Sequence, residues 1–409
     1  MNDQSIQSIA IIGAGIGGLS AALALTKAGF AVTVFEQAGA LGEVGAGIQL
    51  SPNATRVLRD WGVVDRAKRM GFQPKAIKIS HWLSGDQIGR FPVNHNASYK
   101  GQPFIHIHRA DIHQILLDAF LGLNPEGVVV DAKLEGLSFQ SASNKMSLQL
   151  CLKNKPEQQM FDWVIGADGI HSKVRDYVAP DSQARFTGNV AWRGLVPVEK
   201  LSTPLRPDPC SNVIMGPGKH FVCYYVRGGS LVNYVAVMET DQWQEESWTI
   251  KANLEEMMND FSGWNAQVRE VLAHTNPDSC YRWALHDRDP LKVWRKDRCV
   301  LMGDAAHPML PFLAQGAGMA IEDARVLANA FSAHRNDIDK AIDVYIEHRK
   351  PRTTKVQLEA RKNMKLYHFR NTFMQIGRDR YLKFRGEMNP EFFNRRLSWL
   401  FDYQTPLLK

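Results

Sequence analysis

The chain has 409 residues, of which 44% are hydrophobic and 22% charged, a composition that supplies a sizeable core and excludes intrinsic disorder. The formal net charge of +7 fits an anionic ligand, and the lack of any run of five basic residues argues against nucleic acid. Five scattered cysteines without a CxxC pair predict reduced, mostly buried thiols in a cytoplasmic protein and argue against dithiol chemistry.

The N-terminal stretch 4–26 carries no charge, a length that would suit a membrane span. It contains several glycines and polar residues, and no basic segment precedes it, so we expect no stable membrane insertion. Residues 8–12 instead predict a buried strand, and the glycines at 13–18 predict a tight turn. A helix closed by Gly29 follows, and then a second strand over residues 31–35.

The sequence GAGIGG between the first strand and the helix, with Glu36 after the second strand, is typical of a dinucleotide-binding βαβ unit. Gly13 permits the turn, Gly15 lets backbone N–H groups approach a pyrophosphate, and Gly18 lets the helix pack against the strand. The helix N-terminus favours the anion, and the Glu36 carboxylate can accept hydrogen bonds from ribose hydroxyls. A turn without a ligand would leave Glu36 unexplained. The candidate residues are Gly13, Ala14, Gly15, Gly18 and Glu36.

Further elements follow along the chain. We expect a loop over 40–53, a helix over 54–71, a hairpin over 81–91 with Gly85 near its turn, and a strand running into a helix over 104–121. His106 and His108 share a strand face there, but the spacing places no third ligand, so we expect no metal site.

The second half of the chain alternates between buried strands and helices. Residues 161–175 predict a strand, a turn and a helix start, and the runs between about 181 and 285 predict an inserted antiparallel sheet. The remaining predictions are a buried strand over 298–306, a helix over 319–334, a helix over 339–368 interrupted near Pro351, and a packed aromatic tail over 395–403. The chain lacks the second nucleotide fingerprint that a separate NAD(P)H domain would require.

Three motifs stand in order: GAGIGG with Glu36, DWVIGADGIHSKVR at 162–175, and GDAAHPMLPFLAQGAGMAIEDA at 303–324. Over nearly the whole chain, this combination resembles the single-component FAD-dependent aromatic hydroxylases, the group A flavoprotein monooxygenases that include salicylate hydroxylase and 3-hydroxybenzoate 6-hydroxylase. The resemblance implies an α/β fold, with a Rossmann-like, glutathione-reductase-like FAD-binding domain, an inserted mostly antiparallel β-sheet substrate domain, and C-terminal helices. The implied bounds are 1–75, 100–180 and 285–370 for the FAD-binding domain, 76–99 and 181–284 for the substrate domain, and 371–409 for a C-terminal packing segment.

The resemblance also implies how FAD is held. The motif glycines bind its pyrophosphate and Glu36 its adenosine ribose. Gly45 and Ala46 flank the flavin ring, and Arg109 contacts the FAD. Asp168 lies in a motif linked to FAD and NAD(P)H, and Asp304 binds the ribityl chain. The backbone N–H groups offered to the flavin pyrimidine edge are those of Gly316, Ala317, Gly318 and Met319. A helix starting there directs free N–H groups and its positive end toward the charge of reduced flavin. Taken alone, Asp304 would suit a helix cap or a turn equally well.

The implied reaction is hydroxylation of a small anionic phenolic aromatic, such as a hydroxybenzoate, salicylate or a hydroxypyridine carboxylate. It would consume NADH or NADPH and O₂ and proceed through a flavin C4a-hydroperoxide, which must be kept dry. The apolar residues 309–313 would form that dry wall. We expect Gln49, Pro311 and Phe312 in the substrate pocket. Pro311 stands where the 3-hydroxybenzoate 6-hydroxylase subgroup carries Gln, so the ring position that is hydroxylated stays open.

A phenol reacts best as phenolate, so a general base helps. His220 and Tyr224, at i and i+4 of a predicted strand, point to one face and match the His and Tyr near substrate in enzymes similar to 3-hydroxybenzoate 6-hydroxylase. The alternative is a surface His and a cross-strand Tyr. His307 either orients substrate or ties down its loop, and we favour the loop role. Glu322 and Asp323 are expected in the first turns of their helix, where acids suit the dipole.

Two other functions stay open. A ubiquinone-biosynthesis-type hydroxylase would act on a lipid-tailed aromatic, and the basic, aromatic segment 380–403 would suit its docking to a membrane. A non-catalytic FAD-binding sensor would bind FAD without aromatic-stimulated NAD(P)H oxidation, but it would not need a dry chamber. We therefore expect a cytoplasmic enzyme, monomeric or homodimeric, whose partners are a small aromatic acid, O₂ and NAD(P)H.

Overall fold

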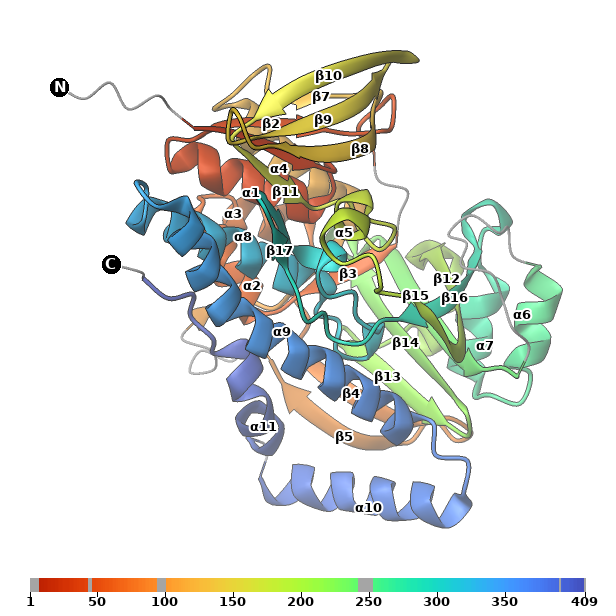
Figure 1. The fold of residues 1–409 in the computed structure, drawn as a ribbon. Helices are drawn as coiled ribbons and strands as arrows, with labels where there is room; N and C mark the ends of the chain where they lie inside the picture. The colour runs from red at the N-terminus through yellow and green to blue at the C-terminus, as the bar shows by residue number, and fades with distance from the viewer. Residues whose placement is uncertain (1–6, 43–45, 94–100, 242–252, 390, 408–409) are drawn as a thin grey trace.

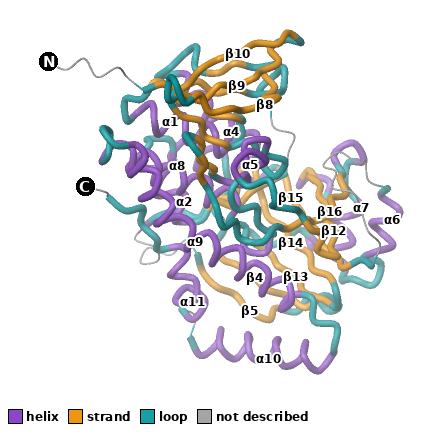
Figure 2. Tube along the Cα trace, in the orientation of Figure 1, coloured by secondary structure: helices purple, strands orange, loops and turns teal. Residues whose placement is uncertain are grey.

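The computed structural model describes residues 7–42, 46–93, 101–241, 253–389 and 391–407. Strands from distant parts of the chain assemble in it into four sheets, with helices packed around them (Figures 1 and 2). No helix in these ranges has the length and apolar character needed to cross a membrane. All five cysteines are free, and all but Cys151 are buried, which confirms the expectation of mostly buried thiols.

A six-stranded sheet in the order β17-β18-β11-β1-β2-β7 forms the centre of the larger half of the molecule. Its strands are β1 (Ser8–Ile12), β2 (Ala31–Phe35), β7 (Val128–Val129), β11 (Trp163–Gly166), β17 (Arg295–Lys296) and β18 (Cys299–Leu301). All neighbouring pairs are parallel except β17 with β18. Continuous apolar runs such as Ile9–Ile12 suit strands covered on both faces.

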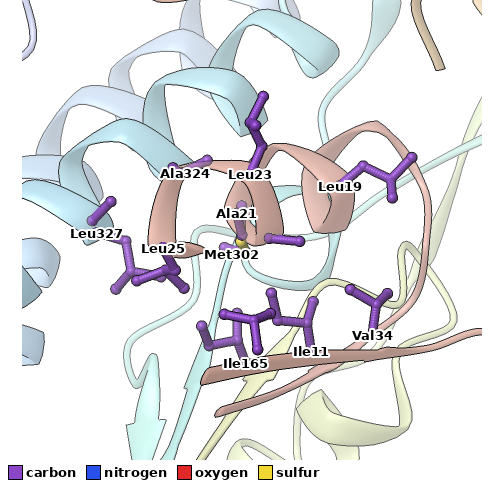
Figure 3. Packing of buried hydrophobic residues seen from close by; sticks show 14 of the residues in the cluster. Ile11, Leu19, Ala21, Leu23, Leu25, Val34, Ile165, Met302, Ala324 and Leu327 are labelled. Atoms are coloured by element: carbon purple, nitrogen blue, oxygen red, sulfur yellow. The ribbon is translucent and has the colours of Figure 1, made fainter. Parts of the chain in front are cut away.

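Helices cover this sheet. They are α1 (Ile16–Lys27), α4 (Arg109–Leu121), α5 (Lys173–Val178), α8 (Gly316–Ala333) and α9 (Ile338–Tyr367). Figure 3 shows α1 between the strands that carry Ile11 and Ile165 and the helix that carries Ala324 and Leu327. This packing aligns the N-terminal ends of α1 and α8 with the carboxyl ends of the parallel strands, where ligands bind in open α/β sheets.

A second sheet has the order β16-β12-β15-β14-β13-β4-β5. Its strands are β4 (Ala76–His81), β5 (Gln87–Pro92), β12 (Arg185–Pro197), β13 (Ser211–Gly216), β14 (Lys219–Val226), β15 (Leu231–Glu239) and β16 (Tyr281–Asp287). Every pairing in it is antiparallel except that of β13 with β4. The predicted α/β fold with an inserted, mostly antiparallel sheet is confirmed, and the domain bounds stay predictions.

The smaller elements surround these two sheets. They are the antiparallel sheet of β8 (Ala132–Gln140), β9 (Lys145–Leu152) and β10 (Lys155–Phe161), the pair β3 (Gly47–Leu50) and β6 (Ile105–His108), and the helices α2 (Pro52–Asp60), α3 (Val64–Met70), α6 (Leu254–Asp260), α7 (Ala266–Ala273), α10 (Thr372–Met388) and α11 (Phe392–Phe401). Figure 1 shows α10 along one edge of the molecule, beside β5. Leu400 and Phe401 are buried, which confirms that the aromatic tail packs.

Three local predictions were wrong. Residues 47–50 form β3 within the predicted loop, because they pair with β6. The predicted helix over 54–71 is two helices, because Gly62 adopts a left-handed φ of +81° between them. Helix α9 continues through Pro351, and buried ion pairs of Arg349 and Arg352 with α8 hold it on both sides of the missing N–H donor.

Candidate active site

A cavity of about 440 Å³ opens where β1, β2, β11 and β18 end. Parallel strands that end together in this way create the crevice in which α/β proteins bind nucleotides. The predicted cofactor residues that line it are Gly13, Gly15, Glu36, Arg109, Asp168, Asp304, Gly316 and Ala317. Three separated motifs therefore meet at one cavity.

The turn between β1 and α1 is shaped for close backbone approach. Gly13 has a φ of +99°, and a Cβ there would lie 2.7 Å from the Ala167 carbonyl oxygen. A Cβ on Gly18 would lie 1.8 Å from the Gly13 carbonyl oxygen, so only glycine lets helix and strand approach this closely. The first turn of α1 carries no acidic residue that would compete for its positive end. These residues fit the pyrophosphate of a dinucleotide.

Glu36 is held at the edge of this cavity. Its Oε2 accepts a hydrogen bond from the Ala14 N–H at 2.8 Å, and its Oε1 accepts one from the Ala38 N–H at 2.9 Å. The Ala14 carbonyl oxygen lies 2.7 Å from His113 Nε2. Ala14 therefore positions Glu36 rather than lining the cavity itself, and the contact of Glu36 with a ribose stays a prediction.

Asp168 organises the loop after β11. Its carboxylate accepts hydrogen bonds from the Ser172 hydroxyl at 2.5 Å and from the Lys173 N–H at 2.7 Å, and Ser172 in turn caps α5. Burial raises the pKa of the Asp168 carboxyl despite these hydrogen bonds. Both oxygens thus serve the loop, and a further role with FAD or NAD(P)H stays a prediction.

Asp304 lies in a short 3-10 turn after β18 and lines both the first cavity and a second one. Its side chain is exposed to these cavities, but the surrounding protein desolvates the carboxyl and raises its pKa. Arg175 donates to the Ala305 carbonyl oxygen at 3.3 Å and ties this turn to α5. The turn is therefore fixed on its protein side while Asp304 faces open space.

The start of α8 separates the two cavities. Gly316 and Ala317 line both, and their N–H groups belong to the first turn, where helical donors lack a partner within the helix. Met319 requires a correction: its N–H donates to the Gln315 carbonyl oxygen at 2.8 Å, and its side chain is buried in an apolar cluster. Gly318 lines neither cavity. The free donors at the cavities are thus those of Gly316 and Ala317.

The second cavity, of about 250 Å³, lies between the antiparallel sheet and residues 308–317. The predicted residues Gln49, His220, Tyr224 and Pro311 line it. Phe312 lines a third cavity of about 140 Å³, which also touches Gln49, His220 and Pro311. Ala46 lines none of the three, and its carbonyl oxygen accepts from the Arg109 N–H at 3.1 Å. Gly45 lies outside the described residues.

His220 and Tyr224 come from β14 and are 3% and 4% exposed, which excludes the surface alternative for His220. Burial, and after it the nearby His368, lowers the pKa of His220 well below its usual value. Its imidazole is therefore neutral near pH 7, with one ring nitrogen able to accept a hydrogen bond. Burial raises the pKa of Tyr224, so this phenol stays protonated and acts as a hydrogen-bonding group.

Arg193 is a residue of the second cavity that the sequence analysis missed. It extends from β12 and stacks at 4.3 Å on the Trp283 ring, and one terminal nitrogen lies 3.4 Å from the Gly47 carbonyl oxygen. Its Nε is buried without a partner, and no carboxylate of the described residues pairs with it. Burial lowers its pKa to about 10, so the guanidinium is still charged at neutral pH. The feature of the sequence that could have revealed this residue is a single Arg within the apolar strand sequence AWRG.

A buried polar network supports the cavities from behind. His307 Nε2 lies 2.6 Å from Asp323 Oδ2, which also accepts from the Gly303 N–H at 2.9 Å, and these contacts confirm the loop role of His307. Glu322 and Asp323 both pair with Arg349, at 2.5 and 2.6 Å. The explanation by the helix dipole was wrong, because both acids are fully buried and ion-paired.

The histidine pair of β6 has protein partners. His106 Nε2 lies 2.6 Å from the Ser211 hydroxyl, and His108 Nδ1 accepts from the Ala110 N–H at 3.2 Å. The described part of the chain holds no group of three His, Cys, Asp or Glu side chains placed to bind a metal ion. Each histidine thus bonds within the fold through one ring nitrogen, while Nδ1 of His106 is buried without a hydrogen-bond partner.

The fold places a cavity suited to a dinucleotide beside a second, smaller cavity. The chain belongs to the FAD-binding domain family, whose model matches residues 7–360. It is 35% identical over 381 residues to 3-amino-4-hydroxybenzoate 2-monooxygenase PtmB3 of Streptomyces platensis, and these residues cover 91% of each chain. It is 32% identical to 3-hydroxybenzoate 6-hydroxylase of Polaromonas naphthalenivorans, covering 97% of this chain and 96% of that one.

A salicylate hydroxylase solved as a substrate complex superimposes with a TM-score of 0.79 at 25% identity, covering 98% of this chain and 97% of that one. The family match and these relatives confirm FAD as the cofactor and place the chain among the FAD-dependent aromatic monooxygenases. The cradle of Gly13 and Gly18 fits this cofactor.

Proposed function

We propose that the enzyme hydroxylates a small anionic phenolic aromatic acid, a hydroxybenzoate, salicylate or a hydroxypyridine carboxylate, using FAD, O₂ and NADH or NADPH. The observation that carries this proposal is Arg193, a cation that faces the second cavity without an acid partner. A substrate carboxylate would supply the missing charge and accept hydrogen bonds from the planar guanidinium. The cavity, at about 250 Å³, lies below the usual range for drug-sized ligands, which favours a single-ring substrate.

The comparisons support this substrate class. One relative is named for acting on an amino-hydroxybenzoate and another for acting on 3-hydroxybenzoate, and each covers more than nine tenths of the chain. Both substrates combine a carboxylate with a ring hydroxyl. The chain supplies a matching pair of groups in Arg193 and His220, which line the same cavity.

The residues of the second cavity have different roles in the reaction. Bound FAD, once reduced, supplies activated oxygen. Arg193 holds the carboxylate and so orients the ring. Neutral His220 accepts the proton of the ring hydroxyl, which makes the ring a better nucleophile. Tyr224 stays protonated beside them and donates or accepts a hydrogen bond.

The segment after the Asp304 turn keeps water away from this reaction. Leu310 and Phe312 are 3% and 5% exposed, and Pro308 and Pro311 carry no N–H donor that would attract water. The Gln357 amide donates to the Pro308 carbonyl oxygen at 2.9 Å and holds the segment against α9. A dry, fixed wall protects the activated oxygen from decay to hydrogen peroxide.

A second candidate is hydroxylation of an aromatic that carries an apolar tail. The third cavity favours it, because apolar side chains such as Ile79, Val213, Leu382 and Leu397 line that cavity and it adjoins the second one at His220. A substrate with a tail would fill both cavities. Comparing hydroxybenzoates with and without an alkyl chain separates the two candidates.

The test is an assay of NADH and NADPH oxidation by the FAD-loaded protein against a panel of monohydroxylated benzoates, hydroxypyridine carboxylates and alkylated phenols. We expect stimulation by a carboxylated phenol, with a product heavier by one oxygen atom, and none by benzoate without a hydroxyl. Failure of the whole acid panel to stimulate oxidation or give product would contradict the proposed substrate class. We further propose a cytoplasmic location, which the buried free thiols and the use of NAD(P)H support.

A further inference from the structure

Two buried histidines from different parts of the fold meet behind the second cavity. His220 lies on β14, and His368 follows the last residue of α9. Nδ1 of His220 lies 2.7 Å from Nε2 of His368, and each side chain is about 3% exposed. A contact this short requires one imidazole to donate and the other to accept. The Nε2 atom of His220 bonds to none of the described residues.

The second histidine connects this pair to the surface. Nδ1 of His368 lies 3.4 Å from Glu239 Oε1 and is buried without a hydrogen-bond partner among the described residues, so a proton passes between the two groups only when they move closer together. The Glu239 side chain is 31% exposed, and its Oε2 pairs at 2.7 Å with Nε of the exposed Arg370. Backbone hydrogen bonds from Gly218 to His368 and from Glu239 to Gly218 hold the ends of β15 and α9 together. Titratable groups thus run in line from the cavity to solvent.

We propose that His368 and Glu239 form the path by which the substrate proton leaves His220 for solvent. The inference rests on the proposed function, since it needs a phenolic substrate beside His220. The phenol O–H bond breaks as its proton binds His220 Nε2, and the proton on His220 Nδ1 passes to His368 Nε2. The proton on His368 Nδ1 then passes to Glu239 Oε1 and on to water. No electrons are exchanged, and the net result is a phenolate and one released proton.

The same path resets itself after the reaction. A proton from solvent enters through Glu239 to His368 Nδ1, the His368 Nε2 proton returns to His220 Nδ1, and the His220 Nε2 proton returns to the product phenolate. Both imidazoles then recover their starting tautomers. His368 and Glu239 are therefore positioning residues that act through His220, and of these three residues only His220 touches the substrate.

The surroundings suit transfer rather than storage of a proton. Burial lowers the pKa of both imidazoles, that of His368 to about 4 even though Glu239 beside it acts in the opposite direction. Among the described residues, the other titratable or charged groups facing the pair are Tyr367, whose ring lies 5.3 Å from that of His220, and Arg370. Neither imidazole holds an extra proton at neutral pH, so each is free to accept one and donate another.

The alternative is that the two histidines merely fasten β14 to α9. His368→Gln distinguishes the two, because an amide keeps one hydrogen bond but cannot accept and release a proton in turn. Glu239→Gln removes the outer acceptor at a partly exposed position, so it stays informative if His368→Gln fails to fold. The matched control is His274→Gln. Among the described residues, the ring of His274, which directly follows α7, contacts only Glu270, at 2.9 Å to its carbonyl oxygen and 4.0 Å to its carboxylate.

The experiment first confirms that the wild-type holoenzyme forms product from a panel phenol, and then follows ionisation of that phenol on binding. Stopped-flow absorbance at the phenolate band, on oxidised holoenzyme without NAD(P)H, gives the rate of proton release. We expect His368→Gln to slow this rate about 10-fold or more, with substrate affinity little changed. Glu239→Gln should slow it less and enlarge its D₂O isotope effect, and His274→Gln should leave it unchanged.

The possible outcomes are distinct. Wild-type ionisation rates in both His368→Gln and Glu239→Gln, in an enzyme that hydroxylates normally, would overturn the proton path and leave the proposed function standing. Loss of thermal stability and affinity in His368→Gln without a slower ionisation would assign the pair to fastening alone. If the wild type forms no product from any panel phenol, both the proposed function and the proton path are wrong.

Discussion

Replacing Arg193 with Gln removes the cation that the substrate carboxylate is proposed to meet. A hydrogen bond to a charged group contributes about 1.5–3 kcal/mol. A loss of about 2 kcal/mol corresponds to a KM roughly 30-fold higher. The fold should tolerate the change, because losing the stacking on Trp283, about 0.5–1 kcal/mol, is offset by removing a buried Nε without a partner.

The chain offers a closely matched control for this variant. Arg282 stacks on Trp192 at 5.0 Å and is paired in the β12–β16 ladder beside Arg193, but it is bonded to Glu256 at 2.7 Å and lines none of the three cavities. Arg282→Gln should leave KM unchanged.

The assay compares KM for a hydroxybenzoate with KM for the phenol that has the same ring pattern but no carboxylate. Arg193→Gln should raise the first and leave the second unchanged, so that the preference for the acid falls about 30-fold. An equal loss on both substrates would show that Arg193 does not recognise charge and would refute this reasoning.

Three further predictions concern the cofactor cradle and the buried network. Gly18→Ala should abolish FAD retention, because the added Cβ would lie 1.8 Å from the Gly13 carbonyl oxygen. The measurement is flavin absorbance after gel filtration. In the control Gly377→Ala, on α10, the added Cβ has no atom within 4 Å, and this variant should retain FAD fully. Arg349→Met should lower the free energy of unfolding in urea by about 3 kcal/mol, the low end for breaking a buried ion pair, because Glu322 keeps Arg352 and Asp323 keeps His307. The exposed pairs of Arg295 should contribute about 1 kcal/mol or less. Burial acts to raise the pKa of Asp323, but His307 and Arg349 outweigh it and lower that pKa to about 2. The stabilisation from this ionised acid is complete above the pKa of about 4 in the unfolded chain and is lost as pH falls toward 2. The free energy of unfolding, measured in urea at a series of pH values, should therefore fall over this range in the wild type and fall less in an Asp323→Asn variant. The same fall in both proteins would contradict the assignment.

The parts of the site that the sequence predicted are those written in local backbone geometry. Gly13 needs a left-handed φ and Gly18 needs the absence of a Cβ. A six-residue glycine motif between a strand and a helix is enough to predict both. The strand predicted over 298–306 forms over Cys299–Leu301, and the helix predicted over 319–334 begins at Gly316. Both were found in the same way, from apolar runs bounded by glycine. Such features depend on neighbours in the chain, so one sequence is enough.

The parts that the sequence did not predict depend on partners far along the chain. Arg193 has the same pattern as any strand arginine, and only the assembled sheet shows that it faces a cavity. His368 meets His220 across 148 residues, a pairing that no spacing rule contains. Pro351 predicts a break by local rules, yet the ion pairs of Arg349 and Arg352 with α8 keep α9 continuous. Tertiary contacts override the local preference there.

We propose that this flavoprotein inserts one atom of O₂ into a carboxylated phenol. The most direct measurement incubates the FAD-loaded protein with NADH or NADPH, ¹⁸O₂ and the acid panel, and follows product mass and cofactor oxidation together. We expect a hydroxylated acid that carries one ¹⁸O for each NAD(P)H oxidised. Oxidation that yields only hydrogen peroxide with every acid, and no labelled product, would contradict it.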